Sequence, residues 1–466
     1  MTLRSPGASA STRRPVSSPF DDREVGSCPV ASADDVERAL ATAHEAHRAH
    51  LAPKRHVRIA ILEGVAARLA ERREELSRLI CDEAGKPISL ARAEVDRAGD
   101  TFRAARDTLT TDRGEVLELS AMASGEGRLG ITRRYPVGVI AAITPFNFPL
   151  NLVAHKLAPA IAAGCPVVLK PSPQAPLSGF ALAELVLEAG LPPPMLSVVA
   201  GPDDVVAPLV DDPRVALLSF TGSERVGFAL RARARGKAVL ELGGNAAVVV
   251  HDDADLDRAA DRIAQGAFAY AGQSCISVQR VLVQRRVHDA LRERLEARID
   301  ALSAGDPTRE DVLVGPVIDD RAVGRLSGVL GDVLARGGRA LREVRWSHRV
   351  LSPTLLVDVP PHHAAREDEL FGPVALVDAY DSFEDGLRQA DAGRFGLQTG
   401  VFTRDVGRLL AAFDALEVGA LLHDDVPTFR VDAMPYGGVR RSGVGREGPR
   451  DAYLEMTEPR LLLLRH

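Results

Sequence analysis

Residues 166–170, Pro-Val-Val-Leu-Lys, form an apolar run short enough for one buried strand, and the break Pro171-Ser172-Pro173 follows it. A helical pattern then runs from about Ser178 to Ala189. Further short apolar runs follow downstream, at residues 196–200, 216–220 and 238–242. Strands that alternate with helices predict an α/β fold with a parallel, doubly wound sheet, and such sheets bind ligands at the carboxyl ends of their strands.

The pattern changes on both sides of this region. Residues 31–112 have apolar side chains at three- and four-residue spacing, which predicts helices, and residues 129–134 and 137–143 are expected to be strands. From Asp252 to Val377 the alternation begins again, which predicts a second α/β domain. The apolar run Leu461 to Leu464 is too short for a domain and is expected to add as a strand to another element.

Composition excludes several classes of function. The chain has 466 residues, 45% hydrophobic and 26% charged, which is typical of a globular protein with two or three domains. The net charge of −6 favours neither nucleic acid nor an anionic membrane, and no apolar run is long enough to span a bilayer. Residues 1–18 are rich in Ser, Arg and Pro and lack a secretory signal, so we expect a flexible N-terminus and a cytoplasmic protein.

Four widely spaced cysteines make a disulfide framework or a metal site improbable and fit a reducing compartment. Cys28, Cys81 and Cys165 are interpreted as structural cysteines. Cys275 differs because it ends the small polar turn Gly272-Gln273-Ser274-Cys275, a setting that favours a nucleophile.

A lone carboxylate stands in a second small turn, Glu241-Leu242-Gly243-Gly244, between an apolar strand and two glycines. A thiol that attacks a carbonyl and a carboxylate that activates water are the two groups required to oxidise an aldehyde through a thioester. The pair therefore predicts this chemistry.

Other motifs follow the predicted strands or lie in the second half of the chain. They are Thr144-Pro-Phe-Asn-Phe-Pro149, Lys170-Pro-Ser172, Phe220-Thr-Gly-Ser223, Glu369-Leu-Phe-Gly-Pro373 and Pro435-Tyr-Gly-Gly438. In this order and at these spacings the set resembles the aldehyde dehydrogenase superfamily, from about Pro19 to the C-terminus. Residues 429–448 are similar to the corresponding segment of lactaldehyde and phosphonoacetaldehyde dehydrogenases.

The resemblance implies a catalytic role for three residues. Cys275 is the expected nucleophile, Glu241 the expected general base, and Asn147 the expected donor to the oxyanion, although an Asn between two prolines also suits a simple turn cap. It also implies NAD or NADP as cofactor. The expected cofactor-binding residues are Lys170, Ser172, Phe220, Gly222, Ser223, Leu242, Glu369 and Phe371.

The choice between NAD and NADP stays open. Many NAD-preferring members carry a Glu three residues after the lysine, and here that position is Pro173, which would not repel a 2′-phosphate. The acidic residues Asp203 and Asp204 argue mildly in the opposite direction.

The substrate pocket is expected to be polar, which suits a small polar or anionic aldehyde. Arg430 is a candidate for binding a carboxylate, phosphonate or sulfonate, and the alternative is a structural ion pair with Asp432 or across a subunit interface. Some phosphonate-oxidising relatives place an Arg directly before the nucleophile, where this chain has Ser274. The expected pocket residues are Phe148, Asn151, His155, Ser274, Ile276, Arg430 and Tyr436.

The expected organisation is that of the family. A Rossmann-like cofactor domain spans 19–117 and 137–243, and an α/β catalytic domain spans 244–445. A small β oligomerisation element combines 118–136 with 446–466, which favours a homodimer or homotetramer.

Other functions stay as alternatives. A CoA-acylating semialdehyde dehydrogenase is disfavoured because such members generally lack Glu241. A general detoxifying aldehyde dehydrogenase would leave Arg430 a structural role. Reduction of acyl phosphates has no positive signal, and a non-enzymatic binding protein would not need every catalytic position filled.

Overall fold

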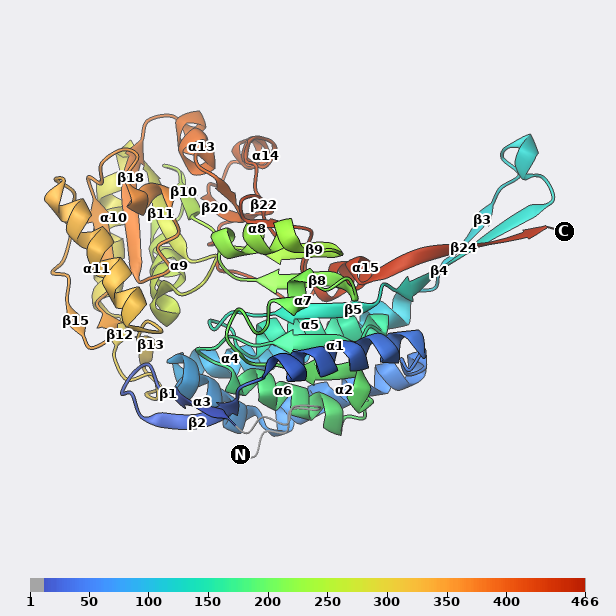
Figure 1. The fold of residues 1–466 in the computed structure, drawn as a ribbon. Helices are drawn as coiled ribbons and strands as arrows, with labels where there is room; N and C mark the ends of the chain where they lie inside the picture. The colour runs from blue at the N-terminus through green and yellow to red at the C-terminus, as the bar shows by residue number, and fades with distance from the viewer. Residues whose placement is uncertain (1–11, 466) are drawn as a thin grey trace.

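The computed structural model describes residues 12–465 (Figure 1). Of the N-terminus predicted to be flexible, residues 1–11 lie outside the described range. The prediction is wrong for the next segment, because β1 (Arg13–Ser17) is a strand paired antiparallel with β2 (Glu24–Pro29). Val16 and Cys28 are buried in the hydrophobic core, and they anchor this hairpin to the body of the protein.

The predicted parallel sheet is a six-stranded sheet in the order β23-β9-β8-β5-β6-β7, in which only β23 is antiparallel. The chain runs outward from β5 through β6 to β7 and then returns to β8, so the strand order reverses between β5 and β8. The strands are β5 (Val139–Ile143), β6 (Val167–Lys170), β7 (Leu196–Val198), β8 (Val215–Thr221), β9 (Lys237–Glu241) and β23 (Gly443–Val444).

The predicted helical segment at residues 31–112 is confirmed as four helices. Gly85 ends the third helix in a left-handed conformation (φ 65°) that favours glycine. The helices of this half are α1 (Ala33–Arg48), α2 (Arg55–Glu71), α3 (Arg73–Ala84), α4 (Ile88–Thr111), α5 (Asn151–Ala163), α6 (Leu177–Glu188), α7 (Pro208–Asp211) and α8 (Glu224–Arg233).

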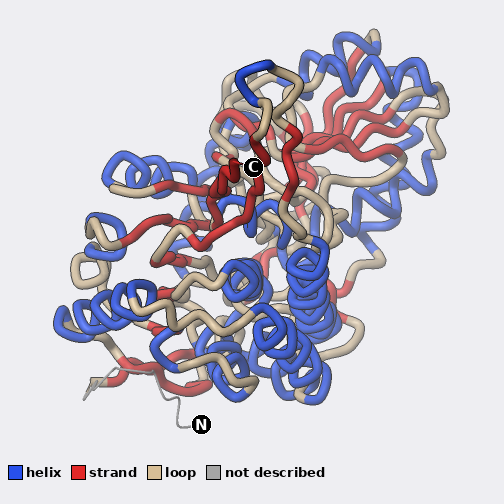
Figure 2. The backbone as a smooth tube through the Cα atoms, turned by 90° about the vertical axis from the view of Figure 1, so that its right-hand side faces the viewer, coloured by secondary structure: helices blue, strands red, loops and turns tan. Residues whose placement is uncertain are grey.

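The second alternating region forms a seven-stranded sheet in the order β14-β17-β18-β11-β10-β20-β21, and helices flank it in Figure 2. The sequence analysis does not predict its strand β10, since the buried run Ala-Ala-Val-Val-Val follows Gly243-Gly244 almost without a break. The strands are β10 (Ala246–Val250), β11 (Val278–Gln284), β14 (Arg339–Ala340), β17 (Thr354–Val357), β18 (Val374–Tyr380), β20 (Gln398–Phe402) and β21 (Ala420–His423). The helices are α9 (Leu256–Phe268), α10 (His288–Asp300), α11 (Asp320–Ala335), α12 (Ala364–Glu367), α13 (Phe383–Asp391) and α14 (Val406–Ala415).

A three-stranded arm, in the order β24-β4-β3, projects from the body in Figure 1 and points toward the viewer in Figure 2. Its strands are β3 (Glu115–Glu118), β4 (Arg128–Pro136) and β24 (Thr457–Arg465). The prediction that Leu461 to Leu464 adds as a strand is confirmed, since this run pairs with residues 129–132 of β4. The arm begins earlier than the predicted boundary at residue 118.

Short elements complete the fold. Helix α15 (Pro449–Glu455), which the sequence analysis assigns to the oligomerisation element, packs against α4 and α5. In the described part of the chain, no helix is both long and apolar enough to cross a bilayer. The remaining elements are β12 (Ser303–Ala304), β13 (Val312–Val314), β15 (Trp346–Ser347), β16 (Val350–Leu351), β19 (Phe395–Gly396), β22 (Val439–Arg440), η1 (Ala123–Gly125), η2 (Pro193–Met195), η3 (Ala269–Gly272) and η4 (Arg285–Val287).

Candidate active site

A cavity of about 590 Å³ is lined by residues that follow strands of both large sheets. The predicted site residues that line it are Asn147, Phe148, Asn151, Gly222, Ser223, Glu241, Leu242, Ser274, Cys275, Ile276, Glu369, Phe371, Arg430 and Tyr436. The predicted residues that do not are His155, Lys170, Ser172 and Phe220. The structure therefore brings the three predicted catalytic side chains into one cavity.

The turn before Cys275 has an uncommon backbone conformation. Tyr270, Ala271 and Gly272 all have positive φ, at 53°, 52° and 64°, which only glycine adopts without strain. The buried Gln273 holds the turn in place, because its Nε2 donates to the carbonyl of Pro316 at 3.1 Å and its Oε1 accepts from the amide of Ile318 at 2.9 Å. The polar side chain of Gln273, which helped to predict the site, therefore holds the loop that carries the Cys275 thiol.

The two glycines after Glu241 allow three parts of the chain to meet. A Cβ at Gly244 would lie 2.5 Å from the carbonyl oxygen of Cys275, and a Cβ at Gly243 would lie 2.3 Å from Oε2 of Glu369. These distances are too short for any side chain. The Cys275 loop can approach the end of β9 only because residue 244 is glycine, and a side chain at residue 243 would displace the Glu369 carboxylate, which accepts from the Gly244 amide at 3.2 Å.

Asn147 follows β5 and is buried beside the Cys275 turn. Its Nδ2 donates to the carbonyl of Gln273 at 3.0 Å, and its Oδ1 has no hydrogen-bond partner in the described part of the chain. An amide nitrogen carries two donors, so the second N–H is left for a ligand.

Two buried charged residues, which the sequence analysis did not select, position the segment after Asn147. Glu94 accepts from the amides of Leu150 and Asn151 at 2.9 and 3.1 Å, and it forms a buried ion pair with Lys86. The Lys86 ammonium lies 3.6 Å from the centroid of the Phe148 ring. Burial lowers the pKa of Lys86 to about 8 even though Glu94 opposes this shift. Both residues line the cavity.

Two buried carboxyl groups, Glu241 and Glu447, have opposite protonation preferences. Burial raises the pKa of Glu241 well above its ordinary value, and the charge of Glu447 adds to that rise. Burial also acts to raise the pKa of Glu447, but His155, Arg430 and Lys156 outweigh it and hold that pKa below its ordinary value. Glu447 therefore carries the negative charge while Glu241 keeps a proton to higher pH. The sequence analysis did not select Glu447.

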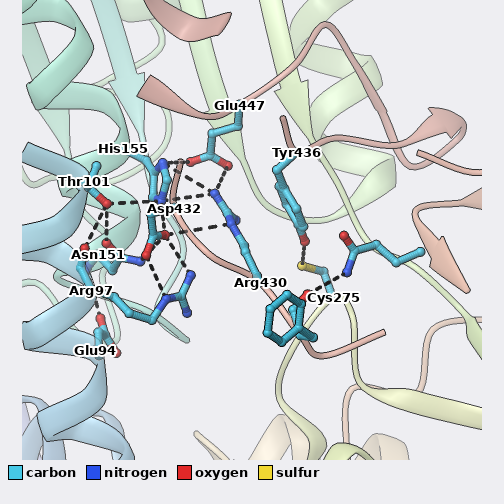
Figure 3. A network of polar contacts seen from close by, with 12 residues as sticks. Glu94, Arg97, Thr101, Asn151, His155, Cys275, Arg430, Asp432, Tyr436 and Glu447 are labelled. Carbon is cyan, nitrogen blue, oxygen red and sulfur yellow. Dashed lines mark hydrogen bonds and ion pairs between the residues drawn. The ribbon is translucent and has the colours of Figure 1, made fainter. Parts of the chain in front are cut away.

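The thiol of Cys275 is coupled to Tyr436 and, through it, to Arg430 (Figure 3). Cys275 Sγ lies 3.0 Å from the Tyr436 hydroxyl, and the Arg430 guanidinium carbon lies 3.7 Å from the centroid of the Tyr436 ring. Burial raises the pKa of Cys275 to about 12. The Tyr436 hydrogen bond and Arg430 oppose this rise, while Glu369 and Glu241 add to it.

Asp432 is the centre of a polar network on the other side of Arg430 (Figure 3). It accepts two hydrogen bonds from Arg97, at 2.9 and 3.0 Å, and its Oδ1 lies 2.7 Å from His155 Nε2. Although burial opposes it, these contacts with His155 and Arg97 hold the pKa of Asp432 well below its usual range. His155, predicted to line the pocket, is instead part of this network behind the cavity wall.

Arg430 is less well neutralised than Arg97. Its nearest carboxylate oxygens belong to Glu447 at 3.8 Å and Asp432 at 3.9 Å, and its Nε has no hydrogen-bond partner among the described residues. The alternative role of Arg430, a structural ion pair with Asp432, would therefore span a long distance between the charged atoms. Arg430 lines the cavity, and its Nη2 also lies 3.1 Å from His155 Nε2. Burial acts to lower the pKa of Arg430, but Glu447, Tyr436 and Asp432 outweigh it and raise that pKa.

The residues expected to hold a dinucleotide suit that group. Ser223 is the N-cap of α8, and its side chain makes no capping hydrogen bond, so the first amides of the helix stay open to an anion such as a pyrophosphate. Glu369 offers a partly buried carboxyl group that can accept from ribose hydroxyls, and desolvation raises its pKa to about 7. Ser172 differs from the expectation, because its hydroxyl donates to Gln174 Oε1 at 2.8 Å.

We predict that Tyr436→Phe slows alkylation of Cys275 by iodoacetamide about tenfold at any pH below the thiol pKa. The neutral phenol stabilises the thiolate as a donor, and loss of a hydrogen bond to a charged group costs about 1.5–3 kcal/mol. The measurement is the alkylation rate of Cys275 between pH 7 and 10, followed by peptide mass spectrometry without aldehyde or cofactor. Tyr270→Phe is the matched control, because that buried hydroxyl donates to the carbonyl of Ala84 instead. Equal rates for wild type and Tyr436→Phe would contradict the prediction.

Known proteins of one family match this chain over nearly its whole length. The Aldehyde dehydrogenase family model matches residues 7–462. The 3-sulfolactaldehyde dehydrogenase of Priestia megaterium is 38% identical, over 93% of this chain and 91% of that protein. The crystal structure of aldehyde dehydrogenase 21 from Physcomitrella patens in complex with the reaction product succinate has a TM-score of 0.95 at 38% identity, covering 97% of this chain and 95% of that chain.

A second solved structure, glyceraldehyde-3-phosphate dehydrogenase of Methanocaldococcus jannaschii complexed with NADP, has a TM-score of 0.94 at 34% identity and covers 98% of this chain and 100% of that chain. The predicted α/β fold and the predicted enzyme class are confirmed by these matches. The chain belongs to the aldehyde dehydrogenase family.

Proposed function

We propose that this enzyme oxidises a small aldehyde with an anionic group to the carboxylic acid, with NAD or NADP as the oxidant. The observation that carries the proposal is Arg430, a buried cation without a close carboxylate in the same cavity as the Cys275 thiol. An arginine in this situation binds a carboxylate, sulfonate or phosphonate through charge-assisted hydrogen bonds. A long aliphatic aldehyde offers no acceptor to these guanidinium donors.

The proposed reaction uses the three catalytic side chains in turn. Cys275 first gives its proton to solvent water. Its thiolate Sγ then forms a bond to the aldehyde carbon, and Asn147 Nδ2 donates to the oxygen on which negative charge develops. A nicotinamide cofactor held in the site would supply the hydride acceptor, and loss of hydride from that carbon would leave a thioester on Cys275. Glu241, once deprotonated, takes a proton from water, the resulting hydroxide displaces the thiol, and the carboxylic acid leaves.

The raised pKa of Glu241 has a consequence for the final step. A general base works only when it is deprotonated, so thioester hydrolysis should accelerate as the pH rises through the pKa of Glu241. Ionised Glu447 keeps a negative charge nearby and delays that deprotonation.

Two competing functions are weaker. CoA-acylating members generally lack the glutamate that Glu241 supplies, which favours hydrolysis to the free acid. A general detoxifying dehydrogenase would gain nothing from Arg430, and the succinate complex of the moss relative shows that a similar fold accepts an anionic product.

We infer which half binds the cofactor and which carries the nucleophile from the residues that each half contributes to the cavity. The half with the six-stranded sheet supplies Ser223, and we propose that it holds the cofactor. The half with the seven-stranded sheet supplies Cys275. A cytoplasmic location stays a prediction of the sequence.

We also propose a homo-oligomer, a dimer or a tetramer. The apolar side chains of β24 from Leu461 to Leu464 are 42–59% exposed, and Val406, Leu410 and Phe413 of α14 are 58–67% exposed. Exposed apolar strands and helix faces of this kind are usually covered by a partner. Light scattering that gave the mass of a single chain at micromolar concentration would contradict the proposal.

The function is tested by following reduced cofactor over a panel of anionic and neutral aldehydes, with NAD and NADP in parallel and Cys275→Ala as the blank. The most informative pair is 4-oxobutanoate and its methyl ester, because the two differ mainly in charge. We expect wild type to prefer the anion.

Arg430→Gln should lower the kcat/KM ratio of the anion to the ester about tenfold or more, since a charge-assisted hydrogen bond contributes about 1.5–3 kcal/mol. Because the ratio compares two substrates of the same variant, it cancels any loss of activity that a displaced Tyr436 causes for both substrates equally. Arg262→Gln is the matched control, because Arg262 also lines the cavity but lies 2.7 Å from its carboxylate partner, Asp425. An equal loss for both substrates in Arg430→Gln would return Arg430 to a structural role.

A further inference from the structure

Two cations meet at the carboxyl end of β6, outside the cavity. Lys170 ends β6, and Arg14 reaches it from β1, at the other end of the sequence. The Arg14 guanidinium donates to the carbonyl oxygen of Pro173. Arg14 is also close enough for its charge to help lower the pKa of Lys170, a shift caused mainly by burial and opposed by Asp203.

The charge of this pair is incompletely compensated. The Lys170 ammonium is mostly buried, and its one ion pair, with Asp203 Oδ1, spans 3.9 Å. The Asp203 side chain is itself almost fully exposed, so that pair is weak. No carboxylate is paired with Arg14 in residues 12–465. Pro173 offers no acidic side chain to either cation.

The position of Arg14 and Lys170 at the end of β6 suggests which ligand they bind. This step rests on the proposed cofactor site. The open N-terminus of α8 follows β8, and the Cys275 thiol lies toward the seven-stranded sheet. The strand order is β9-β8-β5-β6-β7, so a dinucleotide with its pyrophosphate at Ser223 and its nicotinamide toward Cys275 has its adenosine end on the β6 side.

We propose that Arg14 and Lys170 together form a binding site for the 2′-phosphate of NADP. Arginine binds phosphate with a planar fork of N–H donors, and lysine contributes a compact charge. The strand that carries Arg14 is held in register by pairing of Arg14 with Cys28 and by the buried Val16. Arg14 is therefore a cofactor-specificity residue supplied by the N-terminal hairpin.

The neighbouring Arg13 is a matched control on the same strand. Its Nε donates to Ser27 Oγ at 2.8 Å and its Nη2 to the Ser27 carbonyl at 2.5 Å, so it is bound within the hairpin. Both arginines are exposed, and replacing either one leaves the core intact. A change seen with Arg14→Ala and not with Arg13→Ala thus reports on the ligand and not on the hairpin.

The test is isothermal titration calorimetry of the full chain with NADP and with NAD, without aldehyde. Arg14→Ala should raise the Kd of NADP about tenfold and change that of NAD less than about twofold, since one hydrogen bond to a charged phosphate is lost. Arg13→Ala should change neither Kd. Asp203→Asn should tighten NADP alone, because it removes a nearby negative charge.

The outcomes separate this inference from the proposed function. If the wild-type protein binds neither NAD nor NADP, the proposed cofactor site itself is contradicted. If wild type binds both and Arg14→Ala weakens NAD and NADP equally, or neither, only the role of Arg14 is overturned. A selective loss of NADP affinity supports it, and a larger loss in low salt than in high salt would add to that support.

Discussion

The close approach of Gly243 and Gly244 to the Cys275 loop is the constraint on which the site depends. A side chain at Gly244 would meet the carbonyl of Cys275, and one at Gly243 would meet the carboxylate of Glu369. The two glycines therefore let the end of the six-stranded sheet meet the loop that precedes β11 of the seven-stranded sheet. Glu241, Cys275 and Glu369, the proposed general base, nucleophile and cofactor-binding carboxylate, thereby line one cavity although they lie far apart in the sequence.

A second layer of buried charge holds this arrangement in position. Glu94 fixes the start of α5 just after Asn147, and Asp432 pairs with Arg97, which lines the cavity, and with His155 behind the cavity wall. Each of these carboxylates has strong partners, which is the condition under which a charge can be buried. Arg430 is the exception, because its carboxylate neighbours are distant. We propose that these long contacts let the cavity favour an anionic substrate.

The sequence predicted what depends on local pattern. Apolar runs placed β5, β6, β8 and β9 within a residue or two. The turns at the ends of β5 and β9 contributed the candidates Asn147 and Glu241, and the polar turn before β11 contributed Cys275. It did not predict β10, because its apolar run follows the two glycines without a separating turn. His155 was expected in the pocket but contacts Asp432 instead, since one helical residue cannot reveal which neighbour it faces.

Contacts between residues far apart in the sequence explain why the other site residues were not predicted. Lys86 directly follows the glycine that ends α3, and nothing local marks it for a site, yet it is buried over Phe148. Glu447 lies in a glycine-rich segment near the C-terminus, and nothing local distinguishes it from a surface carboxylate. Arg14 belongs to a segment expected to be flexible, whereas pairing with β2 places it beside Pro173. Such contacts, between residues far apart in the chain, are set by the tertiary fold.

The central claim is that oxidation proceeds through a thioester on Cys275 that Glu241 is needed to hydrolyse. The most direct measurement is mass spectrometry of Glu241→Gln after acid quench from a mixture with 4-oxobutanoate and oxidised cofactor. Loss of a general base slows its step about 10²- to 10⁴-fold, so the acyl group should accumulate on the peptide that contains Cys275. Hydroxylamine should then release it. Absence of the adduct in the presence of cofactor reduction, or its appearance on another cysteine, would contradict the account.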